Sequence, residues 1–475
     1  MALSFEQEPI SDSATLPVIT NWNPLVPYVL YQDASIASFF YYKLVLEVRL
    51  TDASGDVIAK IRQRRNGYAT DITNNKARAI FDLRDIVNSQ LQDTNADQNS
   101  TTETIHKIGE NVTAKPFSQN YYQIVTIYVK GYQNYSTAAN TSPADVTAGS
   151  INDTKIYIAA SLNLNTSRDT ADFQGTSFSS YSLNGSSALF LSDIQASVAA
   201  YNLGSVRRNY IQEEDYHTIG FLNGEDDFNS LAQRLYIKYY DSSNAQIGST
   251  QYITNENDTG GAKPETGGTG QVNSDTERLV YFGCGPANLQ AQSETTAARP
   301  SAFTGWVYYT IQAMTTAPAA KSSLYYFIKQ DGSCKDFKVR RLAWINSLGC
   351  FDYFNFKMKS VQTLEVTRNN YNTMLGNFNS DMYSYDNFGR GKNTRNTTAI
   401  LKETLQTDWI TEEDATLLEG LIMSNNVQII ENPDTTYTVP VMIINKSFVK
   451  KTVANDRMIQ YSINIEYANP VNTNS

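Results

Sequence analysis

The stretch from Phe39 to Leu50 reads FFYYKLVLEVRL, and it decides the fold class. Apolar side chains recur in it at every second residue, which is the period of a β-strand with one face on a core. The turn-forming residues 51–56 (TDASGD) follow, and residues 57–61 (VIAKI) form a second apolar run. The stretch therefore predicts a β-hairpin with a glycine-containing loop. The expected core face of its first strand carries Tyr42, Leu44, Leu46, Val48 and Leu50.

Strand patterns of the same kind continue to the end of the chain. Residues 234–247 repeat the order of strand, polar turn and strand. Other runs with strand character lie at 121–132, 155–164, 279–282, 305–311, 324–328, 339–346, 351–356, 427–431 and 438–444. The last run, 457–467, alternates most regularly and is expected to have one buried face and one wet face. The buried face would carry Ile459, Tyr461, Ile463, Ile465 and Tyr467.

Two segments show helical spacing instead. In residues 81–91 the apolar positions fall on one side of a short amphipathic helix. Residues 411–424 begin with Thr411 as a natural N-cap, and acidic residues fill the first turn, where they meet the positive end of the helix dipole. We expect this second helix to lie on the sheet that contains 457–467, so that the two apolar stripes cover each other. Its stripe consists of Leu417, Leu418, Leu421 and Ile422.

Three polar stretches separate these elements. Residues 92–104 and 254–275 contain few apolar side chains and are expected to form loops, the second of them exposed and rich in Gly and Asn. The Asn-rich residues 369–398 are expected to separate the strand at 351–356 from the last helix and its strands. We expect the 254–275 loop to become ordered only where it touches a neighbour.

Length and composition agree with a β-rich protein of several domains. At roughly 150 residues per domain, 475 residues predict about three domains, which we place at 1–205, 206–338 and 339–475. Aromatic residues make up 12% of the chain, and their rings favour sheets. The predicted fold class is therefore mainly β, with several β-sandwich-like units and a small C-terminal α+β unit.

Charge and cysteine content exclude several classes of partner. The formal net charge of −10 provides no cationic field for a phosphate backbone, so nucleic acid is not an expected partner. No long apolar run is present, and the first residues lack the pattern of a signal peptide, so we expect neither membrane insertion nor classical secretion. Three cysteines without a CxxC pair indicate folding in a reducing cytoplasm.

No motif of catalysis or cofactor binding stands out. His217 follows the acidic residues 213–215, but a solvated acidic loop is the preferred interpretation over a metal site. Cys284 lies in a glycine-flanked turn, and residues 389–393 (GRGKN) lack the residues that a phosphate loop needs. Paired carboxylates for glycoside hydrolysis stay open, because their separation is a spatial property. We therefore expect no enzymatic activity, no cofactor and no metal.

Tyrosine doublets are the candidate contact residues. In a strand the two rings of a doublet face opposite sides, so at least one is expected to lie in a core or on a neighbouring subunit. Sugar stacking is the alternative interpretation. The candidate interface residues are Tyr239, Tyr240, Tyr308 and Tyr309, together with Arg390 and Lys392, which could bind a carboxylate-bearing partner.

Several local patterns, in their order along the chain, resemble virion proteins of tailed bacteriophages. The resemblance rests on WNPLVPY at 22–28, FDLRDIV at 81–87, FLN at 221–223, LYIKYYD at 235–241, RRLAWIN at 340–346, FDYFNF at 351–356, DWITEE at 408–413 and the strand at 459–468. It implies a structural component of the tail, baseplate or neck, located in the virion after assembly in the host cytoplasm. Its expected partners are other virion proteins and further copies of itself.

Two functions therefore compete. The first is a non-enzymatic structural subunit that oligomerises through strand edges and aromatic faces. The alternative is a receptor- or polysaccharide-binding adhesin of the tail-fibre type. Repeated strands or heptads, which would build a fibre shaft, are missing from the sequence, and this favours the structural subunit.

Overall fold

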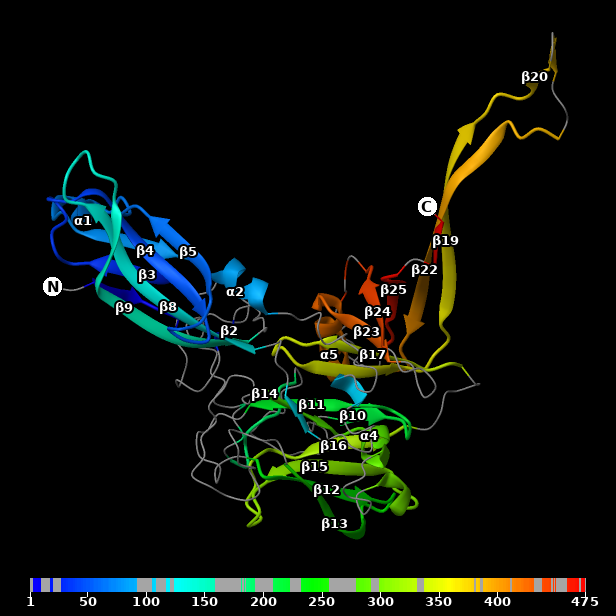
Figure 1. Ribbon diagram of the computed structural model, residues 1–475. Helices are drawn as coiled ribbons and strands as arrows, with labels where there is room; N and C mark the ends of the chain where they lie inside the picture. Colours follow the sequence, from blue (N-terminus) through cyan, green and yellow to red (C-terminus); the bar gives the residue numbers. More distant parts are fainter. Residues whose placement is uncertain are drawn as a thin grey trace. The chain divides into compact units, whose positions relative to one another are not determined.

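The structure is a computed structural model of the whole chain (Figure 1). It describes residues 3–9, 18–19, 27–91, 105–107, 117–119, 124–158, 181, 183, 185–192, 208–222, 232–255, 279–291, 299–330, 337–379, 382–384, 388–410, 412–430, 438–445, 447, 449, 459–469 and 471–474. The predicted loop at 254–275 lies outside these ranges except for its first two residues, and the predicted loop at 92–104 lies outside them entirely.

The chain forms two compact units. The first comprises Met1–Gln330 and Ile345–Asp352, and the second comprises Asp331–Trp344 and Tyr353–Ser475. The predicted domain boundary at 338/339 falls shortly after the main segment of the first unit ends, and the one at 205/206 lies outside the described residues. These domain boundaries stay predictions, whereas the mainly β fold class with several antiparallel sheets is confirmed.

The N-terminal part of the first unit is a β-sandwich. Its larger sheet has the order β2 (Val18–Ile19), β9 (Ala144–Ile158), β8 (Ile124–Ser136), β4 (Phe40–Leu50) and β5 (Val57–Gln63). Its smaller sheet has the order β1 (Leu3–Gln7), β3 (Tyr28–Gln32) and β6 (Ala77–Phe81). The short helices α1 (Ala69–Thr73) and α2 (Arg84–Gln90) flank β6 in the sequence. One apolar core joins both sheets and α2, and it includes Leu30, Leu46, Val48, Phe81 and Val87.

The hairpin predicted from residues 39–61 is confirmed as β4 and β5. Leu46 lies opposite Ile61 and Val48 opposite Ala59 in an antiparallel ladder. The central residues of β4 are buried on both faces. On the face opposite Leu46 and Val48 lies Glu47, whose carboxylate binds Arg49 and lies 3.2 Å from the Tyr132 hydroxyl. The predicted helix at 81–91 is likewise confirmed as α2.

The neighbouring hairpin is longer than the sequence predicts. The run at 155–164 was expected to begin a strand after an Asn-, Ser- and Thr-rich connection, but β9 already begins at Ala144. Residues 144–146 and 151–154 pair with β8 in spite of their mostly polar side chains, with an irregularity between the two stretches. Most of these residues are exposed, so the ladder there is held by backbone hydrogen bonds and gives no alternating hydrophobic signal.

A second sandwich follows in the same unit. Its five-stranded sheet has the order β10 (Arg208–Ile211), β16 (Tyr325–Lys329), β15 (Tyr308–Met314), β12 (Arg234–Tyr240) and β13 (Gln246–Thr254), with β10 and β16 parallel. The three-stranded sheet consists of β11 (Thr218–Leu222), β14 (Leu279–Gly283) and β7 (Phe117–Gln119). The short helical elements of this part are η2 (Ile105–Lys107), α4 (Pro286–Ala291) and η6 (Pro300–Ala302).

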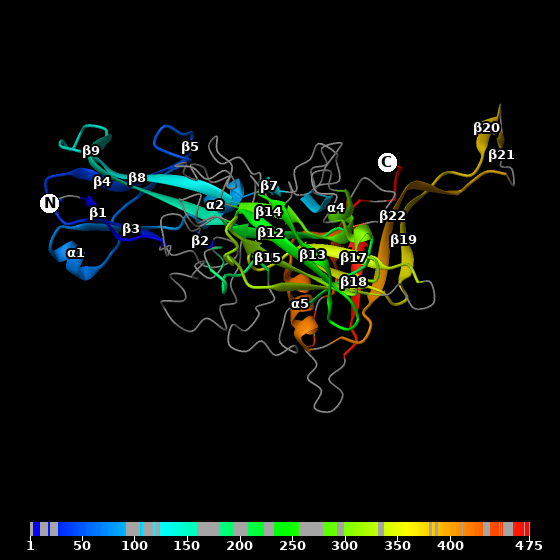
Figure 2. The same cartoon turned by 90° about the horizontal axis from the view of Figure 1, so that it is seen from below.

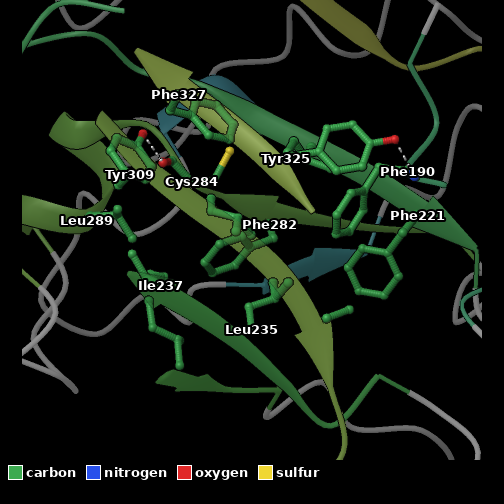
Figure 3. Packing of buried hydrophobic residues seen from close by; sticks show 14 of the residues in the cluster. Phe190, Phe221, Leu235, Ile237, Phe282, Cys284, Leu289, Tyr309, Tyr325 and Phe327 are labelled. Carbon is green, nitrogen blue, oxygen red and sulfur yellow. Dashed lines mark hydrogen bonds between the residues drawn. The ribbon is translucent and has the colours of Figure 1, made fainter. Parts of the chain in front are cut away.

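Aromatic side chains from both sheets meet in this second core (Figure 3). The rings of Tyr309 and Phe327 stack in parallel, with centroids 4.9 Å apart. The tyrosine hydroxyls of this core have hydrogen-bond partners. The Tyr309 hydroxyl donates to the backbone oxygen of Cys284 at 2.8 Å, and the Tyr325 hydroxyl accepts from the Phe190 amide at 3.0 Å (Figure 3). The segment around Phe190 is thereby fixed to the sandwich.

The buried side chain of Asn288 fixes the corner between β14 and α4. It accepts a hydrogen bond from the His217 amide at 2.8 Å and donates one to the backbone oxygen of His106 at 2.9 Å. Cys284, predicted to occupy a tight turn, is buried at this corner, next to Gly285. One amide side chain thus joins three segments that are distant in the sequence.

The second unit contains one eight-stranded sheet. The main order is β18 (Phe351–Phe356), β17 (Arg340–Ile345), β23 (Val427–Ile430), β24 (Thr438–Ile443), β25 (Ser462–Tyr467), β22 (Lys392–Gln406) and β19 (Val361–Asn372), and β26 (Asn472–Asn474) also pairs with β22. The tip of the β17–β18 hairpin, residues 345–352, belongs to the first unit. The small two-stranded sheet of β20 (Asn377–Asn379) and β21 (Met382–Ser384) lies between β19 and β22 in the sequence.

The C-terminal helix and strand largely match their predicted patterns. The helix α5 covers Glu412–Met423, and three of its four stripe residues, Leu417, Leu418 and Leu421, are buried. Ile463 and Ile465 of β25 are buried, Asn464 between them is partly exposed, and Ser462 at the start of the strand is exposed. The predicted N-cap Thr411 lies outside the described residues. Among the described residues, no helix combines the length and hydropathy that a membrane span requires.

A buried carboxylate shows that this sheet curves. Arg340 Nε of β17 donates to Glu403 Oε1 of β22 at 3.0 Å, although β23, β24 and β25 separate the two strands in the sheet. The other carboxylate oxygen accepts from the Tyr467 hydroxyl at 2.8 Å and from Gln362 Nε2 at 3.1 Å. Burial acts to raise the pKa of Glu403, but these hydrogen bonds outweigh it and hold the pKa below its usual value.

Candidate interaction surface

The strands β19 and β22 form a long hairpin that projects from the sheet of the second unit (Figures 1 and 2). We call residues 361–406 the arm. The sequence predicted that residues 369–398 only separate two structured parts of the chain. That prediction is wrong, because residues at both ends of this segment continue the ladder of β19 and β22. The ladder runs from the pair Val361 and Thr404 to the pair Asn372 and Lys392. At about 3.3 Å per residue, the twelve residues of β19 span roughly 40 Å.

The arm has an open strand edge along β19. In the described sheet β19 has β22 as its single neighbour, and every residue of β19 except Val366 is exposed. On the other side of β22, pairing with β25 and β26 ends at Thr397. A long exposed edge presents a row of backbone donors and acceptors that can pair with a strand of another chain.

Polar side chains hold the distal part of the hairpin together. The Thr394 hydroxyl donates to Asn370 Oδ1 at 2.9 Å across the two strands. Near the tip, the Thr373 hydroxyl donates to the backbone oxygen of Arg390 at 2.6 Å and accepts from Asn393 Nδ2 at 3.0 Å. The Asn and Thr residues that make this segment look like a loop in the sequence therefore order a two-stranded ribbon.

The tip of the arm exposes large apolar side chains. Phe388 has 94% of its surface exposed, Met374 76% and Met382 74%. Leu375 and Tyr383 are also exposed. Large apolar side chains that are exposed together indicate an interaction surface, so the tip is the candidate contact site of the arm.

The distal part of the arm is basic, although the whole arm, residues 361–406, contains five basic and four acidic residues. Residues 366–400 contain four basic residues and two acidic ones, whereas the chain as a whole carries a net charge of −10. The basic residues are Arg368, Arg390, Lys392 and Arg395. Within the described part of the chain, none of these four forms an ion pair. Arg390 and Lys392, two of the predicted contact residues, thus lie beside the apolar tip and are exposed.

The structure divides the predicted tyrosine contacts into two pairs. Tyr239 and Tyr309 are buried in the second core and are not accessible to a partner. Tyr240 and Tyr308 lie on the opposite face of the same two strands, partly exposed, and their rings stack with centroids 4.7 Å apart. A partner contact through the second pair stays a prediction.

The acidic residues before His217 do not converge on one site. Glu213 binds Lys329 at the surface, whereas Asp215 is buried and accepts from the Gln212 amide at 2.8 Å. The His217 ring packs edge-on against Phe327 with centroids 5.1 Å apart. In the ranges that the structure describes, no group of three or more His, Cys, Asp or Glu side chains is placed to hold a metal ion. Cys284 and Cys350 are buried thiols.

The apolar residues of the arm's tip were not identified from the sequence. Each of them is isolated among polar residues, so neither a strand period nor a helix period connects them. A signal was nevertheless present, because Met374, Met382 and Phe388 are large apolar residues in a segment with no core of its own.

Neither protein-family models nor curated protein sequences give a match to this chain. Its function is therefore inferred from its own residues.

Proposed function

We propose that this protein is a non-enzymatic structural subunit of a tailed-phage virion and that it forms homo-oligomers through the arm. The observation that carries the proposal is the projecting hairpin, which combines an open strand edge with an exposed apolar tip. A monomer would leave both in water, whereas a neighbouring copy can pair with the edge and cover the tip.

The charge pattern supports a second copy as the occupant. The basic residues of the arm face a chain that is strongly acidic elsewhere, so an arm from one copy is attracted to the body of another. The like charges of the two bodies also disfavour contacts that do not involve the arm. Placement in the tail, baseplate or neck rests on the resemblance of the local sequence patterns to virion proteins.

Light scattering of the purified full-length chain tests the arm. We expect an oligomer for the natural chain and a shift to monomer for a variant with Met382→Ser and Phe388→Ser. The matched control is Met423→Ser, which removes a side chain that is 63% exposed on α5. The double variant keeps its fold because both side chains are exposed, and a circular dichroism melt checks this. An unchanged oligomer in the double variant, or a monomeric natural chain, contradicts the proposal.

The virion location has its own test. An antiserum against the purified chain should label assembled phage particles at one fixed position. Labelling of the host bacterial cytoplasm alone, with none on particles, contradicts that placement.

Incubation with host polysaccharide and peptidoglycan tests the absence of catalysis, and release of soluble fragments by the chain would contradict it.

A further inference from the structure

A pocket of about 900 Å³ lies at one end of the N-terminal sandwich. Four segments that are distant in the sequence build it: residues 36–43 around the start of β4, Arg64 and Arg65 after β5, Asn75 after α1, and the β8–β9 turn at 139–143. Its volume lies within the usual range for small-ligand sites, roughly 300–1,000 Å³. The arm belongs to the other unit and contributes nothing to it.

The pocket wall contains basic side chains without acidic partners. In the described residues, Lys43, Arg64 and Arg65 form no ion pair, and both arginines are exposed. Asp145, the carboxylate on the adjacent strand, already binds Lys60 at 2.7 Å and lies 3.4 Å from Arg62. Nothing in that network neutralises the three cations, so an anionic ligand can pair with them directly.

Aromatic rings form a second part of the wall. Phe39 and Tyr42 line the pocket. The ring of Tyr135 stacks on Tyr42 with centroids 5.9 Å apart and packs at a tilt against Phe39 with centroids 4.0 Å apart. Tyr41 also lines the pocket and is 60% exposed. Flat apolar faces next to cations suit a ligand that has both an apolar face and an acidic group.

The backbone at the pocket is fixed in an uncommon conformation. Four non-glycine residues with positive φ occur in the described part of the chain, and two of them, Tyr41 at 57° and Asn75 at 55°, line this pocket. The Tyr41 hydroxyl donates to the backbone oxygen of Ala139 at 2.8 Å, and the Ile36 amide donates to that of Asn75 at 2.8 Å. These bonds hold the loops in place, and such local strain concentrates at binding sites.

We propose that this pocket binds a short acidic saccharide, with its carboxylate on Arg64, Arg65 and Lys43 and a sugar face on the aromatic rings. The net charge of −10 works against long polyanions, so the ligand carries one or two negative charges. A terminal sugar acid of a surface glycan has this chemistry. The inference does not depend on oligomerisation through the arm.

Isothermal titration of the full-length chain with digalacturonic acid tests the pocket. We expect saturable binding at millimolar concentration, none with the neutral disaccharide lactose, and binding about tenfold or more weaker in the double variant Arg64→Ala and Arg65→Ala. The control Arg62→Ala removes a positive charge from β5, two residues before Arg64 and outside the pocket lining, and it should bind like the natural chain.

Three results would overturn the assignment. They are no saturable binding of digalacturonic acid, equal binding by the double variant, and equal binding of a Glu-Glu dipeptide, which would show that charge alone is recognised. A variant with Tyr41→Ala adds an independent check, since it should weaken the binding of the acidic saccharide more than that of the Glu-Glu dipeptide. Light scattering of the same variants should give the natural mass, so failure here is distinct from failure of the proposed assembly.

Discussion

Gly285 is a position where the second core has no room for a side chain. A β-carbon built there would lie 2.4 Å from the backbone nitrogen of His217 and 2.6 Å from the backbone oxygen of Asp215. Neither backbone atom can move away as a flexible side chain could. The glycine is therefore required by close approach of two chain segments and not by its own φ.

We predict that Gly285→Ala lowers the free energy of unfolding by about 1–3 kcal/mol, because the corner between β14 and α4 must shift. Urea unfolding followed by tryptophan fluorescence measures the change. The control Gly185→Ala should alter the free energy by less than about 0.5 kcal/mol, since its β-carbon would meet nothing within 4 Å. Equal effects of the two substitutions would show that the close approach at Gly285 does not exist.

Glu403 predicts a pH dependence with a defined sign. Its pKa is lowered in the folded chain, so its contribution to stability is complete above the unfolded pKa of about 4.3. Below that pH the unfolded chain binds a proton that the folded chain does not, which favours unfolding. The contribution is gone once the pH has fallen through the folded pKa and the folded carboxylate is protonated as well. The Glu403→Gln variant lacks this component.

Urea unfolding at a series of pH values from neutral to strongly acidic checks this prediction. The free-energy difference between the natural chain and Glu403→Gln should shrink as the pH falls below about 4.3. Glu403→Gln also removes the negative charge that pairs with the buried Arg340, so the variant should be less stable at neutral pH by about 3–5 kcal/mol. A difference that stays constant with pH would contradict the assigned pKa direction.

At the scale of elements, α5 and β25 test the C-terminal core. Leu421 and Ile463 are buried, and truncation of either to Ala should cost about 2–5 kcal/mol through lost burial and a cavity. Ser462, adjacent to Ile463 and exposed, is the matched control and should change stability by less than about 1 kcal/mol on replacement by Ala. Thermal unfolding of the three variants decides the matter. A damaging Ser462→Ala would mean that both faces of β25 are covered.

Elements with one face on a core could be predicted from the sequence. The hairpin of β4 and β5 and the strand β25 carry apolar side chains at every second residue, because one face of each strand packs against an apolar core. The helices α2 and α5 could be predicted for the same reason, since each buries a stripe at helical spacing.

Elements without a buried face could not be predicted from the sequence. The strand β19 is exposed almost throughout, and the first residues of β9 are also exposed, so their pairing depends on backbone hydrogen bonds that leave no mark on the pattern of side chains. The candidate pocket was missed for another reason. Its four segments are brought together by the fold, and no local spacing connects Lys43 with Arg64 or with the turn at 139–143.

For the whole molecule, the arm predicts an assembly that depends on salt. Because Arg390, Lys392 and Arg395 are exposed, their attraction to an acidic neighbour is screened as ionic strength rises. We expect sedimentation velocity to show less oligomer at 1 M than at 0.1 M sodium chloride, where the screening length falls from about 10 Å to about 3 Å. The double variant Arg390→Glu and Lys392→Glu should reduce the oligomer already at low salt. An oligomer that strengthens with salt would show that apolar burial alone drives assembly.

Whole-molecule architecture places the two proposed activities on different units. The arm belongs to the second unit and the acidic-saccharide pocket to the first. A subunit that assembles through one unit can present the other to a ligand in many copies, and multiple copies raise the apparent affinity of a weak site.

The most direct test of assembly through the arm is photo-crosslinking from its tip. The photoreactive residue benzoylphenylalanine replaces Phe388, which is 94% exposed, so the substitution does not disturb the fold. We predict that irradiation of the purified chain yields a covalent dimer, and that mass spectrometry maps the crosslink to an acidic surface of the second copy. The same residue in place of Tyr252, on the edge strand β13, should yield far less dimer. Irradiation that leaves the Phe388 variant entirely monomeric, at concentrations where the natural chain is an oligomer, would contradict the account.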